Sequence, residues 1–255
     1  VFESIDLDRG PKVDNLSYGT LIGFDSRFKE RRHGWTSLTS SFLGYHGSSL
    51  DYGNVDIMSN GAHVGITKNY YKKNFWTALS MTGNVGIGEI SEMYGDDNIV
   101  SLSGAVSSKT GYNMEFNEGK FIIQPNVSLS YYISKIFDYT NEAGVRINSD
   151  PLNAFEIKPG IRLIGNTEGG WQPYISAAFV WNTFNDTDVR ANGIKLPEMS
   201  MDPYVEYGLG IQRVLNNDFT CYLQSLVRNG GRTGVSLTGG MSWAVGRVNR
   251  GRVHL

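Results

Sequence analysis

Apolar and polar residues alternate along the stretch from Lys120 to Ile133, which reads KFIIQPNVSLSYYI. Phe121, Ile123, Val127 and Leu129 occupy every second position, whereas the intervening positions hold mainly glutamine, asparagine and serine. A period of two residues places the two sets on opposite faces of a β-strand. The stretch is therefore predicted to be a strand with one apolar face and one largely polar face.

The same alternation recurs along the whole chain, and helical periodicity is absent. It is clear in residues 60–71, 75–87, 100–116, 153–163, 171–181, 205–212 and 234–245, and weaker in 1–7, 16–28, 35–45 and 219–228. The count is about 12 strands, and an even number of strands of roughly 10 residues is typical of closed membrane barrels.

The connections between these strands alternate in length. Short connections are expected around 29–34, 72–74, 117–119, 165–170 and 215–218, and long ones at 47–59, 88–98, 135–151 and 185–203, with shorter members near 8–15 and 229–231. Outer-membrane barrels have short turns at one end and longer loops at the other, whereas a soluble Greek-key sandwich has no reason to sort its loops in this way.

The small polar faces indicate which way the strands point. Faces of glycine, serine, threonine and asparagine are too small to fill a protein core, so the bulky faces are predicted to meet lipid. An ordinary half-buried sheet would explain any one strand but not all of them. Aromatic residues near strand ends are predicted to meet the lipid headgroups: Tyr70, Phe75, Phe116, Phe121, Tyr131, Trp171 and Trp181. The predicted fold is an all-β, transmembrane, up-and-down antiparallel barrel over residues 1–246, followed by a basic tail, 247–255.

Composition removes some classes of function. The net charge of -2 gives no support for nucleic-acid binding, and the single Cys221 excludes an internal disulfide. No run of some 18 apolar residues is present to form a membrane-spanning helix. No signal peptide is recognisable at Val1, so we expect a mature product or a fragment.

Several segments resemble the β-domain of autotransporters, the translocator unit of type V secretion. They are YGTLIGFDSRF, WTSLTSSFLGYHGSS, TGYNMEFNEGKFIIQPNVSLSYY, WQPYISAAFVWNTF, YVEYGLGIQRVLNNDFTCYLQSLVRNGG and the closing TGGMSWAV. The resemblance implies a 12-stranded outer-membrane barrel that anchors, and helps export, a passenger domain upstream of Val1. It also implies that Gly240, Trp243 and Val245 form a signal read by the outer-membrane assembly machinery, although a plain last strand with an aromatic anchor explains the same residues.

The resemblance further implies a bacterial outer-membrane location, with lipid as a partner, the long loops outside and both termini in the periplasm. Two features depart from the family. The chain opens directly in a strand at VFESIDL, so no autoproteolytic residue can be carried over, and GRVNRGRVHL continues beyond the last aromatic strand. That tail could be a periplasmic extension, a plug of the lumen or a remnant of expression.

Charged residues on the predicted inner faces form the main candidate site. Asp25 and Arg27 lie early in the chain, and a later group comprises Glu156, Lys158, Arg162, Glu206 and Arg228. Charges facing a wall of low dielectric constant need a partner or water. The later group is therefore predicted to form an ion network across the lumen that braces the barrel and sets pore selectivity. Separate hydrated charges are the alternative.

Catalytic signatures are lacking. The chain has four histidines, but no serine in a G-x-S-x-G elbow and no H-E-x-x-H or H-x-x-E-H pair. The acidic runs GDDN and FNDTD lack EF-hand spacing and are expected to be solvated loops. We expect no catalysis, cofactor or metal. The alternatives to export are a stand-alone outer-membrane pore or structural or adhesive barrel and, less favoured, a barrel hydrolase that uses His63.

Overall fold

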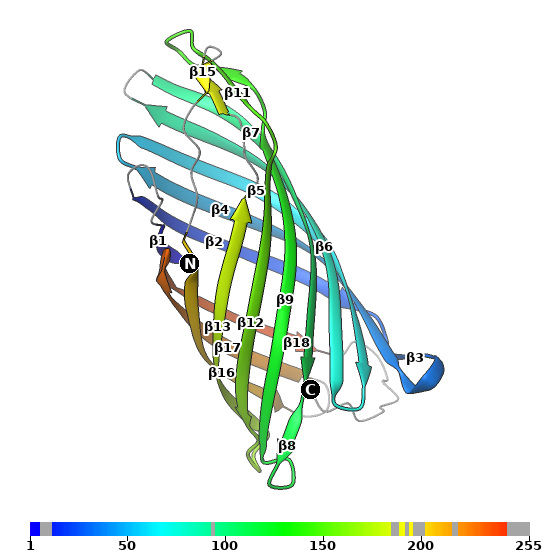
Figure 1. Ribbon diagram of the computed structural model, residues 1–255. Helices are drawn as coiled ribbons and strands as arrows, with labels where there is room; N and C mark the ends of the chain where they lie inside the picture. The colour runs from blue at the N-terminus through cyan, green and yellow to red at the C-terminus, as the bar shows by residue number, and fades with distance from the viewer. Residues whose placement is uncertain are drawn as a thin grey trace.

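The computed structural model describes residues 1–5, 12–92, 95–184, 189–191, 194–195, 202–215 and 219–243. Twelve antiparallel strands close into one barrel in the order β12-β13-β16-β17-β18-β1-β2-β4-β5-β6-β7-β9, and β9 pairs back to β12. These wall strands are β1 (Phe2–Ile5), β2 (Val13–Asp25), β4 (Thr36–Tyr52), β5 (Val55–Lys72), β6 (Phe75–Glu92), β7 (Gly95–Tyr112), β9 (Phe121–Ile136), β12 (Leu152–Gly165), β13 (Trp171–Phe184), β16 (Tyr204–Leu215), β17 (Phe219–Gly230) and β18 (Arg232–Trp243). The predicted up-and-down barrel is confirmed, and Figure 1 shows its tilted strands.

Seven minor elements lie outside the wall. At the end with short turns, β3 (Lys29–Glu30) and the 3₁₀ turn η1 (Arg32–Gly34) follow β2, and β8 (Met114–Phe116) pairs with the start of β9. At the other end, β10 (Tyr139–Thr140), β11 (Arg146–Ser149), β14 (Val189–Ala191) and β15 (Ile194–Lys195) form a separate small sheet. No helix among the described residues is long and apolar enough to span a membrane.

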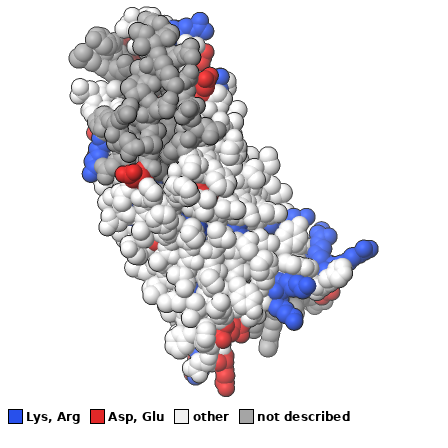
Figure 2. Space-filling view, viewed as in Figure 1, with Lys and Arg blue, Asp and Glu red and all other residues white. Residues whose placement is uncertain are grey.

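The barrel is apolar outside and polar inside, as predicted. On β9, Phe121, Leu129 and Tyr131 are 59%, 41% and 46% exposed, whereas the alternate residues Gln124 and Ser130 are buried. Most strands repeat this pattern, and the buried apolar set of the described chain is small: Ile90, Ile99, Ile122, Val180 and Tyr204. A soluble protein of this size buries most of its large apolar residues, so the exposed apolar faces need lipid as their solvent. In Figure 2, charged residues gather towards the ends of the visible face.

Two of the predicted long connections are wrong. Residues 47–59 are mostly strand, because β4 runs to Tyr52 and β5 begins at Val55. Residues 88–98 are likewise occupied by the ends of β6 and β7. The alternation of apolar and polar residues fades there because these strand ends extend beyond the part of the wall that faces the hydrocarbon of the membrane. Outside that part, neither face of a strand has to be apolar. The backbone ladder nevertheless continues. The connection predicted at 135–151 is a true excursion that carries β10 and β11.

The first described strand joins the two sides of the wall. β1 pairs with β2 on one side and with β18 on the other. Just before it, the Val1 nitrogen donates to the carbonyl oxygen of Ser17 at 2.7 Å, and the Ser17 N–H donates to the Val1 carbonyl oxygen at 2.8 Å. β1 therefore closes the seam between β2 and β18.

Candidate functional site

A chain of ion pairs lines the wall of the lumen. Its first half centres on Glu206 of β16, whose side chain is 8% exposed. Lys158 Nζ of β12 lies 2.5 Å from Glu206 Oε1, and Arg228 Nε of β17 donates to Oε2 at 3.1 Å. Lys158 reaches over β13, on which the fully buried Val180 lies opposite Tyr204. One carboxylate thus joins β12 to β17 across the intervening strands.

The second half of the chain centres on Glu3 of β1. Its side chain is 1% exposed and holds two arginines: Arg228 Nη1 lies 2.7 Å from Oε2 and Arg232 Nη2 lies 2.5 Å from Oε1. Asn15 of β2 donates from Nδ2 to Oε1 at 2.9 Å. A buried carboxylate is stable only when its charge is paired and its lone pairs accept hydrogen bonds, and here both conditions are met.

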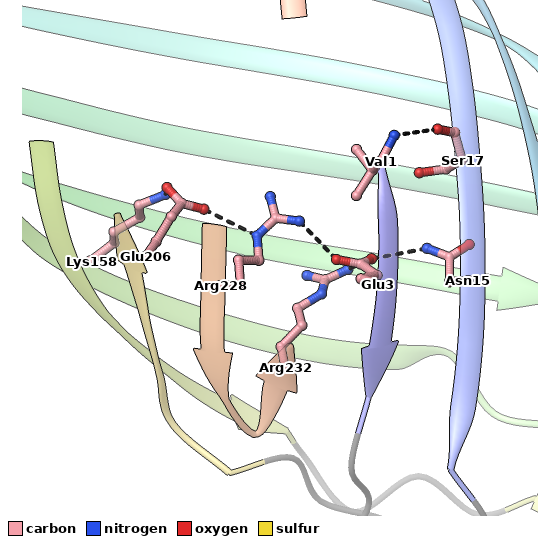
Figure 3. Close-up of polar contacts among 8 residues, drawn as sticks. All are labelled: Val1, Glu3, Asn15, Ser17, Lys158, Glu206, Arg228 and Arg232. Carbon is pink, nitrogen blue, oxygen red and sulfur yellow. Dashed lines mark hydrogen bonds and ion pairs between the residues drawn. The ribbon is translucent and has the colours of Figure 1, made fainter. Parts of the chain in front are cut away.

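The complete series of ion pairs, called the ion chain below, follows the wall around the barrel, as Figure 3 shows. It runs from Lys158 through Glu206, Arg228 and Glu3 to Arg232, with Asn15 at its far end. Arg228 contacts both carboxylates and so joins the two halves. The linked strands include β18, β1 and β2, which form the seam. The chain therefore adds side-chain bonds across this seam.

The predicted lumen charges are only partly brought together. Lys158, Glu206 and Arg228 are in the chain, whereas Glu156 and Arg162 form no ion pair with any described residue. The guanidinium of Arg162 instead lies over the ring of Tyr174, 4.6 Å from its centroid. The sequence prediction missed Glu3 and Arg232. Extending the alternation of 234–245 back by two residues would have placed Arg232 inside, but the alternation in residues 1–7 is too weak to orient Glu3.

The predicted interface aromatics lie in two groups along the outer wall. Tyr131 and Trp181 lie on the halves of β9 and β13 nearer the long loops, 46% and 50% exposed. The other five lie at the short-turn end: Tyr70, Phe75, Phe116, Phe121 and Trp171. Of the second group, Phe116, Phe121 and Trp171 are exposed, whereas Tyr70 and Phe75 are half-buried. The two groups are separated along the strands, and their contact with lipid headgroups stays a prediction.

The closing strand is described only in part. Gly240 lies opposite Tyr222 of β17, whose ring occupies the space that a side chain at position 240 would fill. The side chain of Trp243 and the whole of Val245 lie outside the described residues, as does the tail 247–255. Cys221 is a free cysteine on β17, opposite Met241 of β18.

Two histidines face each other inside the barrel. His46 of β4 and His63 of β5 have ring centroids 5.8 Å apart, and His63 also lies against Phe42. Neighbouring glycines make room for them, because a side chain at Gly44 or Gly61 would collide with an imidazole. The described residues contain no group of three or more histidine, cysteine, aspartate or glutamate side chains suited to a metal ion.

Comparisons with known proteins agree with this architecture. The family model described as autotransporter beta-domain matches residues 6–225. No curated protein matches the chain in sequence. Among solved structures, the transport unit of the autotransporter AIDA-I from Escherichia coli is similar with a TM-score of 0.83 at 16% identity, covering 96% of this chain and 88% of that one.

Two further structures show the same barrel. The β-domain of the Bordetella autotransporter BrkA has a TM-score of 0.76 at 18% identity, covering 95% of this chain and 96% of that one. The translocator domain of NalP from Neisseria meningitidis has a TM-score of 0.74 at 12% identity, covering 95% and 84%. At these identities the structures establish the fold alone. Since the family model covers most of the residues, however, this chain belongs to the autotransporter β-domain family.

Proposed function

We propose that this barrel anchors a passenger domain in the bacterial outer membrane and helps to export it. The observation that carries the proposal is a closed barrel with lipid-facing apolar residues and a polar bore, in a chain that matches the autotransporter β-domain over most of its length. The family places the protein in the outer membrane with a passenger attached. As a domain, the family is non-enzymatic.

The mechanism is physical. Every wall strand in a closed barrel can satisfy its backbone donors and acceptors with neighbouring strands, so the barrel is stable in hydrocarbon. The inner faces carry glycine, serine, threonine and asparagine, which offer a wet surface to an unfolded or tethered polypeptide. Folding of the passenger outside the cell and the assembly machinery would supply the free energy, because the sequence contains no nucleotide-binding motif.

Orientation and the role of the ion chain are parts of the same proposal. The end with β10, β11 and the extended hairpins would face outward, and the end with short turns would face the periplasm, with the end of β18 on that side. The predicted placement of Val1 there is wrong, because Val1 lies opposite Ser17 of β2, nearer the end with the extended hairpins. The chain from Lys158 to Arg232 would brace the wall and set the ion selectivity of the bore. Gly240, Trp243 and Val245 would serve the assembly machinery, and the aromatic bands would anchor the barrel in lipid.

The proposal is tested by fusing a signal peptide and a small, protease-sensitive passenger domain ahead of Val1. In cells, we expect the barrel to appear in the outer membrane and the passenger to be cleaved by protease added outside. Heat-modifiable migration of the barrel on a gel establishes that it has folded. A folded barrel in the outer membrane whose passenger stays protected from external protease would contradict export.

A further inference from the structure

The lumen contains a basic cavity that the ion chain leaves unused. It lies at the short-turn end and has a volume of about 280 Å³. Three cations line it together with Trp76 and Tyr174: Lys109 of β7, Arg162 of β12 and Lys73 of the turn between β5 and β6. No aspartate or glutamate is among the described residues of its lining, and none of the three cations forms an ion pair with a described residue. The cavity thus concentrates positive charge that the described wall does not neutralise.

The hydrogen-bond donors of Arg162 are not used by any described residue. Its guanidinium stacks on the Tyr174 ring at 4.6 Å, and the Tyr174 hydroxyl donates at 2.8 Å to Gln224 of the next strand but one, which holds the ring in place. Stacking uses the flat face of a guanidinium and leaves the N–H groups at its edge available. Those edge groups match the two oxygens of a carboxylate.

The rest of the lining suits a peptide. Gln124 donates to Asn113 at 2.7 Å and Gln172 donates to Asn166 at 2.8 Å, so two amide side chains are fixed against the wall. Asn69 and Gln212 line the same cavity and make no hydrogen bond with a described residue. Free amides can donate to, and accept from, a peptide backbone, whereas a small anion needs only the cations. The indole N–H of Trp76 is also without an acceptor among the described groups.

Nearby carboxylates do not compete for this site. Glu206 is already held by Lys158 and Arg228. Glu156 lies on the same face of β12, six residues from Arg162 and towards the long loops. We propose that Lys109 and Arg162 form a subsite of the lumen that binds an aspartate or glutamate side chain of a polypeptide segment lying in the bore. The inference rests on the proposed function, because export or anchoring is what would bring such a segment into the lumen.

The experiment measures binding of labelled peptides to the full chain in detergent by fluorescence anisotropy. One short glycine–serine peptide carries two aspartates, and its partner carries asparagines at the same positions. We expect the aspartate peptide to bind about tenfold more tightly, which is about 1.4 kcal/mol. Equal binding of the two peptides would overturn the inference.

Three variants locate the effect. The double variant Lys109→Gln/Arg162→Gln should lose the preference for aspartate, and Arg162→Lys should keep only part of it because lysine cannot form the paired bonds. Lys68→Gln is the matched control, since Lys68 lies on the outer face of β5, opposite Leu79, and should keep the full preference. Heat-modifiable migration shows that each variant is folded. A preference that survives in the folded double variant would overturn the inference.

Inorganic phosphate, titrated at constant ionic strength, separates a peptide site from a general anion site. Phosphate binding as tight as that of the aspartate peptide would overturn the assignment to a polypeptide.

The result of the peptide-binding experiment can be told apart from the result of the export assay. If the passenger reaches the surface while both peptides bind equally, this inference fails and the proposed function stands. If export fails but the aspartate preference follows Lys109 and Arg162, the subsite stands alone.

Discussion

Single residues of the lumen carry the closure of this barrel, and Glu3 is the most important of them. It is the most deeply buried charged side chain among the described residues, at 1% exposure, and it contacts Arg228, Arg232 and Asn15. Its strand pairs with β2 on one side and with β18 on the other. The side-chain bonds of Glu3 therefore add to the backbone bonds that hold β1 between β2 and β18.

Replacing the Glu3 carboxylate should weaken the seam. Glu3→Gln would leave Arg228 and Arg232 without the carboxylate between them, and breaking a buried ion pair costs about 3 kcal/mol. We expect a lower midpoint of urea unfolding in detergent and partial loss of heat-modifiable migration. Glu115→Gln on the exposed β8 is the control and should behave as the parent does. Unchanged unfolding of Glu3→Gln would show that β1 is held by its backbone bonds alone.

Glu206 belongs to the same chain but should also affect ion flow. Glu206→Gln removes the only carboxylate among the described residues that Lys158 contacts, and it leaves an excess of positive charge in this part of the lumen wall. We expect the reversal potential measured across a planar bilayer in a salt gradient to shift towards anion selectivity. The control is Glu89→Gln, which makes the same charge change on an exposed residue of β6. Equal shifts in the two variants would mean that the lumen charge does not set selectivity.

At the scale of the strand, close backbone approach at glycine is as important as charge. Gly234 of β18 lies opposite Glu3 of β1. A Cβ atom at Gly234 would lie 2.5 Å from the Glu3 Cα and would also collide with the Phe2 carbonyl oxygen. These are backbone atoms, which cannot rotate away as the end of a flexible side chain can. The two strands of the seam therefore depend on a glycine at this position.

Gly234→Ala should consequently push β1 away from β18. Overpacking of this kind costs about 1 to 3 kcal/mol, and we expect a corresponding fall in the midpoint of urea unfolding. Gly83→Ala is the matched control, because nothing lies within 4 Å of the Cβ that it would add. The prediction fails if the two alanine variants unfold at the same urea concentration. A large loss in both would indicate a general intolerance of strand glycines.

The elements of the fold were predictable to the extent that lipid imposes a pattern on them. The period of two residues in 60–71, 75–87 and 121–133 arises because one face must be apolar in the bilayer, and all three segments are strands. The pattern fades at Ser48, Ser49 and Asp51, yet β4 continues to Tyr52. Backbone hydrogen bonds hold the ladder there, and the side chains carry no signal of it.

The candidate site was less predictable because its contacts depend on neighbouring strands. Alternation places Lys158, Glu206 and Arg228 inside the barrel, but only the register between strands decides which of them meet. Arg162 faces inward on the same strand as Lys158 and finds an aromatic ring instead of a carboxylate. Glu3 could not be oriented, because the alternation in residues 1–7 is weak.

At the scale of the whole molecule, the two ends of the barrel differ. The short-turn end carries tight turns with positive φ angles at Lys73, Asn117 and Glu118, together with the basic cavity. The opposite end carries the extended hairpins β4–β5 and β6–β7 and the small sheet of β10, β11, β14 and β15. Outer-membrane barrels place short turns in the periplasm and longer loops outside, so this asymmetry predicts the direction of insertion.

Labelling of single cysteines in intact cells measures that direction. In a Cys221→Ser background, Asn54→Cys lies in the turn between β4 and β5, and Asn117→Cys lies in the turn between β8 and β9. We expect a membrane-impermeant maleimide to label position 54 in intact cells and position 117 only after the outer membrane is permeabilised. Full labelling of both after permeabilisation is the control for reactivity. Labelling of position 117 alone in intact cells would contradict the proposed orientation. It would place the basic cavity at the cell surface instead of on the periplasmic side, from which an exported segment enters the lumen.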